Sequence, residues 1–260
     1  MRGKFVCGLL ITILVSNGHA QDLPVLAIEH VNVIDVISGE VLTDRTVIVR
    51  DANIASIVDA ANSQVPDNAV RIAAAGKFLI PGMWDMHIHW YDRNSMELFP
   101  INGVTGARVM SGMPLHHMWR KQFEASEFLG PHLLIASPII DGPSPIWPGS
   151  FVATDEADGK QVVARAVENK ARELFALLAE NKTWQCPTLT VLRNLAYFQN
   201  KEIEFGSVTV GKQADLVILD ANPLDDISNT QKIHAVILRG TLIDRRALYA
   251  KLDGFDQTKK

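Results

Sequence analysis

The chain has 260 residues, enough for one or two domains. Hydrophobic residues make up 47% of it and charged residues 21%, an ordinary globular composition that excludes disordered, collagen-like and coiled-coil proteins. The formal net charge of −4 argues against a nucleic-acid partner, and no apolar run reaches the roughly 18 residues of a membrane span.

The N-terminus has the pattern of a secretory signal peptide over residues 1–20. Two basic residues precede an apolar run from Phe5 to Val15, and a short stretch of small and polar residues ends at Ala20. Because the run is too short for a membrane anchor, we expect cleavage near Ala20 and export to the periplasm or the medium. Cleavage would leave Cys186 as the single cysteine, so no internal disulfide is expected.

The two ends of the mature chain are rich in predicted strands. Four segments are apolar and β-branched: 25–36, 46–60, 214–219 and 233–238. Residues 51–53 interrupt the second segment in the manner of a hairpin turn. Neither end has enough strands to bury a face alone, so we expect residues 21–81 and 206–250 to form one composite β-sandwich.

The middle of the chain, residues 82–205, alternates predicted strands and helices. The expected strands are 82–89, 104–110, 132–140 and 187–192. A long helix is expected over 155–181, where apolar residues recur at helical spacing. This alternation predicts parallel βα units and an α/β fold class.

His87 and His89 are the candidate metal ligands. On a strand, side chains two residues apart point to the same side, and two adjacent imidazoles can bind one divalent metal, typically zinc. Asp85 shares that side. The alternative is that both histidines are merely polar residues on a half-exposed strand, because this spacing alone is a weak signal.

The segment around these histidines, 77–89, resembles the entry strand of the amidohydrolase superfamily, and more closely exported hydrolases related to imidazolonepropionase and to Xaa-Pro or Xaa-Arg dipeptidases. Further resemblances follow in chain order at 98–108, 130–140, 183–189 and 206–227. The resemblance implies a TIM-like (β/α) barrel with a divalent metal, zinc, at His87 and His89. It also implies hydrolysis of C–N bonds in a small amide or dipeptide-like substrate.

The middle region is short for this family, because an eight-unit barrel typically needs about 250 residues. At about 30 residues per unit, residues 82–205 hold roughly four. We therefore expect an incomplete barrel that lacks two blocks, near Lys170–Ala171 and Asn200–Lys201. The family's later metal ligands (a lysine, two histidines and an aspartate) have no matching positions in this sequence.

Catalytic zinc usually has three protein ligands and a nearby general base. Asp85, Asp92 and His132 are the residues that could assist the histidine pair, although Asp85 is a flanking residue in the family. We therefore expect weak metal binding and poor hydrolysis. The alternative is a non-catalytic remnant with a binding or assembly role, or with none. The open sheet edges also favour self-association.

The remaining candidates are assigned packing roles. His116 and His117 lie at an expected helix start and Cys186 lies on an apolar strand, and Trp147 and Trp184 are more typical of packing than of substrate binding. Trp147 lies in a loop that could border a pocket. The chain contains neither a glycine-rich phosphate loop nor a serine-hydrolase elbow, which argues against a nucleotide cofactor and a serine nucleophile.

Overall fold

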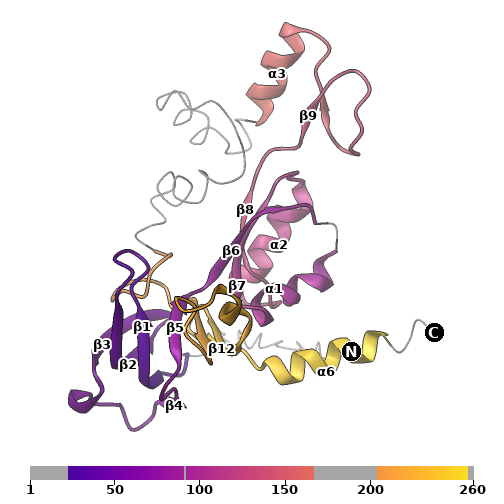
Figure 1. The fold of residues 1–260 in the computed structure, drawn as a ribbon. Coiled ribbons are helices and arrows are strands. Elements are labelled where there is room, and N and C mark those ends of the chain that lie inside the picture. The colour runs from indigo at the N-terminus through magenta and orange to yellow at the C-terminus, as the bar shows by residue number, and fades with distance from the viewer. Residues whose placement is uncertain (1–22, 91, 167–203, 257–260) are drawn as a thin grey trace, which may run out of the picture.

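The computed structural model describes residues 23–90, 92–166 and 204–256. Within these ranges the chain is a mixed α/β protein with a large sheet, a small parallel sheet and a two-stranded ribbon (Figure 1). The expected signal peptide, the strand at 187–192, both expected deletions, Trp184 and Cys186 lie outside the described residues.

The large sheet combines strands from both ends of the chain. Its members are β1 (Leu26–Ile34), β2 (Val41–Arg50), β3 (Asn53–Asp59), β4 (Val70–Ala73), β5 (Phe78–Pro81), β11 (Leu216–Leu219), β12 (Ile233–Leu238) and β13 (Thr241–Leu242). They run in the order β13-β12-β11-β5-β1-β2-β3, with β4 paired to β1. The two ends meet where β11 pairs antiparallel with β5.

The predicted hairpin is confirmed, because β2 and β3 pair antiparallel around Asp51 and Ala52. These two residues have φ values of 49° and 66°, as a tight hairpin turn requires. The N–H of Ala214 donates to the carbonyl of Ala52 at 2.7 Å, so the hairpin turn touches the chain just before β11. β2 begins earlier than expected, at Val41, because its first residues pair with the end of β1.

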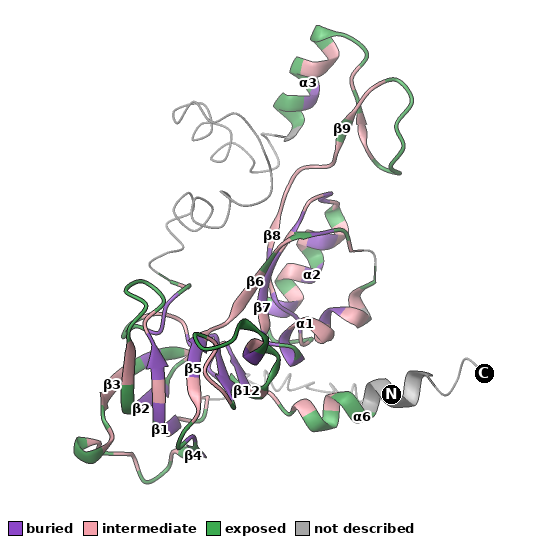
Figure 2. Ribbon diagram, in the orientation of Figure 1, coloured by how far each residue is buried: buried purple, intermediate pink, exposed green. Residues whose placement is uncertain are grey.

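β11 lies in the most buried part of this sheet, and all four of its residues are buried. Leu216 and Ile218 belong to one apolar cluster and Val217 and Leu219 to another, because successive side chains point to opposite faces. Figure 2 shows the same concentration of buried residues along β1 and β2. Both faces of the central strands are therefore covered.

The small sheet contains three parallel strands, β6 (Met83–Ile88), β7 (Val104–Val109) and β8 (His132–Ile135). Between them lie η2 (Arg93–Glu97) with α1 (Leu98–Ile101), and then α2 (Pro114–Glu124). Trp119 and Phe123 of α2 pack with Ile88 and Leu133 in one apolar cluster. The parallel βα arrangement predicted from the alternation is thus confirmed for these strands.

The strand predicted over 132–140 is too long. β8 ends at Ile135, after which the N–H of Ala136 still donates to Val109 and the chain then leaves the sheet. Pro138 has no N–H to donate to a ladder, which favours this exit. Beyond it, β9 (Ile140–Asp141) pairs with β10 (Phe151–Val152).

Two helices complete the described chain. α3 (Glu156–Ala166) matches the start of the helix expected over 155–181, whose remainder lies outside the described residues. α6 (Arg245–Asp256) follows the last strand of the large sheet. Asp244 caps this run of good helix formers by accepting the N–H of Ala247 at 3.0 Å. Among the helices of the described ranges, none is long and apolar enough to cross a membrane.

Candidate metal site

The two predicted histidines lie at the carboxyl end of β6. Ile88, between them, is buried in the cluster with α2, whereas His87 and His89 are exposed. Their Nε2 atoms lie 3.3 Å apart, and the two rings stand at 60° to each other. The strand alternation therefore brings both imidazoles to one place, at the end of a parallel sheet where binding sites usually form.

The spacing of this pair fits a single metal ion. Two imidazole nitrogens at the usual zinc distance of about 2.05 Å, in tetrahedral geometry, stand about 3.3 Å apart. The 3.3 Å between Nε2 of His87 and Nε2 of His89 equals this value. The separation of the two nitrogens therefore suits two ligands of one zinc ion.

Neighbouring residues hold the two histidines in place. The Nδ1 atom of His89 lies 3.1 Å from Oγ of Ser111, which follows β7. The indole of Trp147 stacks on the His89 ring, with centroids 5.6 Å apart and an angle of 6° between the planes. Asp85 lies on the same side of β6 as predicted, and its Oδ1 accepts the backbone N–H of His87 at 3.1 Å.

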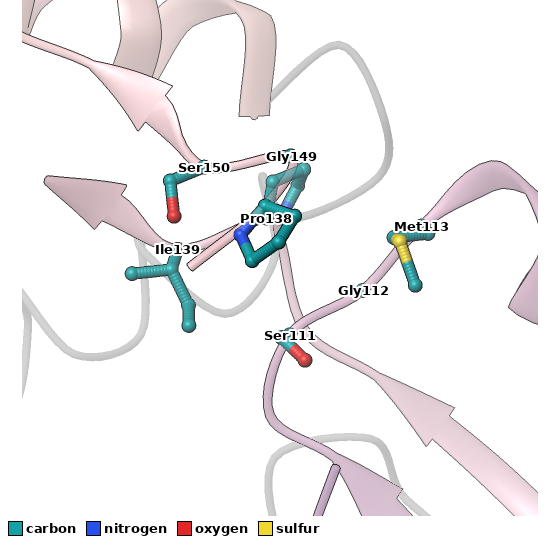
Figure 3. A pocket seen from close by; sticks show the side chains of 8 residues that line it. Ser111, Gly112, Met113, Pro138, Ile139, Gly149 and Ser150 are labelled. Carbon is teal, nitrogen blue, oxygen red and sulfur yellow. The ribbon is translucent and has the colours of Figure 1, made fainter. Parts of the chain in front are cut away.

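A small recess lies beside Ser111. Three segments line it, and Figure 3 shows residues of each: the turn after β7, the stretch after β8 and the loop before β10. The lining residues are Ser111, Gly112, Met113, Pro138, Ile139, Pro148, Gly149 and Ser150. Ser111 belongs both to this recess and to the surroundings of His89.

His132 does not assist this pair, contrary to one of the expectations. It begins β8 and is in register with Gly106, which in turn pairs with Trp84 near the start of β6. His132 therefore lies at the amino end of the sheet, whereas His89 lies beyond the carboxyl end. Its Nε2 lies 2.9 Å from Oδ2 of Asp215.

His116 has the packing role expected for it and is fully buried. Its Nδ1 accepts the N–H of Met113 at 3.0 Å, and its Nε2 lies 2.7 Å from the carbonyl oxygen of Trp90. Burial lowers the pKa of His116, which favours the neutral imidazole. His116 thus ties the residue after His89 to the start of α2.

No further ligand joins the pair within the described part of the chain, where no group of three or more His, Cys, Asp and Glu side chains could hold a metal. Asp92 accepts a hydrogen bond from the Ser95 hydroxyl. Sequence reasoning missed Ser111, and it placed Trp147 in a loop that could border a pocket but not beside His89. Ser111 was detectable, because it follows the strand adjacent to β6, whereas Trp147 is brought in by a long loop that carries no such signal.

Comparisons with known proteins find similar solved structures, but no similar family profile or curated protein. No protein-family profile and no curated protein matches the chain. A candidate prolidase from Bifidobacterium longum has a TM-score of 0.67 at 15% identity, covering 88% of this chain and 99% of its own. A Xaa-Pro dipeptidase with bound methionine has a TM-score of 0.66 at 14% identity, and the similarity covers 84% of this chain and 99% of that one. Molinate hydrolase has a TM-score of 0.64 at 13% identity, and the similarity covers 87% of this chain and 96% of that one. At these identities the similarity establishes a shared fold.

Proposed function

We propose that this chain, which is related in fold to the amidohydrolase superfamily, is a metal-dependent hydrolase of C–N bonds in small amide or dipeptide-like substrates. The observation that carries the proposal is the 3.3 Å separation of Nε2 of His87 and Nε2 of His89. The names of similar structures support it, since they include a Xaa-Pro dipeptidase, a molinate hydrolase and a phenylurea hydrolase.

A bound zinc ion would lower the pKa of a water molecule towards neutrality and polarise the carbonyl group that is attacked. The chain's own residues prepare this chemistry. His87 and His89 would hold the ion, Asp85 fixes the backbone of His87, and Trp147 covers one face of the His89 ring. Because catalytic zinc usually has three protein ligands, a pair of histidines predicts weak binding.

The architecture that we propose is an incomplete barrel of about four βα units over residues 82–205, joined to a composite β-sandwich of residues 21–81 and 206–250. The three parallel strands β6, β7 and β8 support the first part, and the pairing of β5 with β11 supports the second. In the described chain β6 and β8 are edges of their sheet. Unpaired edges favour association with a second copy.

Hydrolysis that depends on added zinc is the expected result for the purified full chain. The substrates would be Xaa-Pro dipeptides, N-acyl amino acids and phenylureas, assayed with zinc, after chelation, and after zinc is restored. We expect slow turnover of at least one class, loss of that turnover on chelation, and recovery with zinc.

His30→Ala controls for the loss of a surface histidine away from the proposed site, because His30 is an exposed histidine of the large sheet that pairs with Asp44. This variant should keep the zinc-dependent rate. Turnover that survives complete chelation would contradict the proposal. Stoichiometric zinc binding without turnover of any substrate class would favour the non-catalytic binding role instead.

A further inference from the structure

We infer that the exposed pair of His87 and His89 joins two copies of this chain through one zinc ion held by four imidazoles. The inference rests on the proposed function, because it makes the joined state a closed and inactive form of the same metal site. Zinc in proteins is usually tetrahedral with four ligands, and one pair supplies two of them. A second copy with the same pair would supply the other two.

The described part of a single copy offers no third ligand to this pair. Its His, Cys, Asp and Glu side chains form no group of three or more that could hold a metal. Every histidine beyond the expected signal peptide lies in the described ranges. Among them His116 is fully buried, and His132 and His234 pair with aspartates elsewhere. A further imidazole for the ion therefore comes from another molecule.

The geometry of the pair suits a four-nitrogen site. In a tetrahedral zinc site all nitrogen–nitrogen distances are similar, at about 3.3 Å when each Zn–N distance is about 2.05 Å. Nε2 of His87 and Nε2 of His89 have this separation. A two-fold axis through the ion would place the second pair at the same distances, so both copies would use the same residues.

The pair is open to a second molecule. Both histidines are exposed, whereas Ile88 between them is buried. Trp147, which stacks on the His89 ring, is 46% exposed, and Ile146 beside it is 85% exposed. A second copy bound at the ion would remove part of this apolar surface from water, which favours the association.

The joined state cannot hydrolyse a substrate. Catalytic zinc keeps one position open for water, whereas zinc with four protein ligands is closed. The ratio of zinc to protein therefore controls the site by mass action. At half an equivalent of zinc each ion engages two pairs, and in excess zinc each pair binds its own ion and the copies separate.

Light scattering of the full chain during a zinc titration tests the inference. We expect the mass to rise from its metal-free value to about twice that value at half an equivalent of zinc, and to fall again in excess zinc. The double variant His87→Ala/His89→Ala should keep its metal-free mass throughout. The matched control His234→Ala, which removes a partly exposed histidine of the large sheet, should behave like the wild type.

X-ray absorption at the zinc edge of the wild type gives a second test that needs no variant. We expect four imidazole ligands at half an equivalent of zinc and two in excess zinc. Fewer than four at half an equivalent, or doubling of the mass in the double variant, would overturn the inference.

The same titration separates this inference from the proposed function. Zinc binding without any change in mass would overturn the inference alone. Zinc-joined copies that hydrolyse no substrate class at any zinc ratio would overturn the proposed function alone. A wild type that binds no zinc would overturn both.

Discussion

Replacement of Asp215 by alanine is expected to destabilise the protein by about 3–5 kcal/mol, the usual effect of leaving a buried charge without its partner. The Asp215 side chain is 5% exposed, and its Oδ2 lies 2.9 Å from Nε2 of His132. Its Oδ1 accepts the backbone N–H of Arg239 at 2.7 Å. Burial lowers the pKa of the Arg239 guanidinium, and the carboxylate of Asp215 opposes that shift.

This pair joins the two main sheets. Asp215 immediately precedes β11 of the large sheet, whereas His132 begins β8 of the parallel sheet. Arg239 reinforces the junction, because its Nη2 donates to the carbonyl of Gly130 at 3.1 Å. Loss of the carboxylate therefore removes the larger of the two opposing charges that act on the Arg239 guanidinium, the other being that of Glu124, at the point where the sheets meet.

Urea unfolding measures this prediction, with Asp220→Ala as the matched control. Asp220 also pairs with a basic residue, Lys77, at 2.7 Å, but its side chain is 48% exposed. Exposed pairs are typically worth less than about 1 kcal/mol. Equal losses of unfolding free energy in Asp215→Ala and Asp220→Ala would contradict the prediction, because the buried junction would then stabilise the fold no more than an exposed ion pair does.

The second large effect is expected from the double variant His87→Ala/His89→Ala, which should weaken zinc binding by more than about 100-fold. The reason is geometric, since the two Nε2 atoms, 3.3 Å apart, would bind the ion as one chelate. For the same reason either single variant should lose most of the affinity. Chelator competition on the full chain measures both effects.

The control for this prediction is His234→Ala. His234 is a partly exposed histidine whose Nδ1 lies 3.2 Å from Oδ1 of Asp220 in the large sheet. Its removal should leave zinc affinity unchanged. If the double variant bound zinc as tightly as His234→Ala, the metal would be bound elsewhere in the chain.

Much of the site's framework could be predicted from local sequence. The period of two along a strand placed His87 and His89 on one side, and the structure brings them together while Ile88 is buried. Pro114 at the start of α2 is a typical first helical residue. The structural comparisons show that the chain shares its fold with solved prolidase and amidohydrolase structures, as the resemblance of the region 77–89 implied.

The features that could not be predicted depend on contacts between distant segments. Ser111 is 22 residues from His89 in sequence, and only the register of β6 with β7 brings them together. Trp147 reaches His89 through an irregular loop, and His132 is excluded from the site by the direction of β8. Local patterns specify which way a side chain points on its strand, but not which residue lies opposite.

Anomalous X-ray diffraction at the zinc edge, on crystals of the zinc-loaded protein, tests the central claim most directly. We predict one anomalous peak at about 2.0–2.1 Å from the Nε2 atoms of both His87 and His89. A peak bound by other residues, or zinc-loaded crystals with no peak between these two rings, would contradict the account.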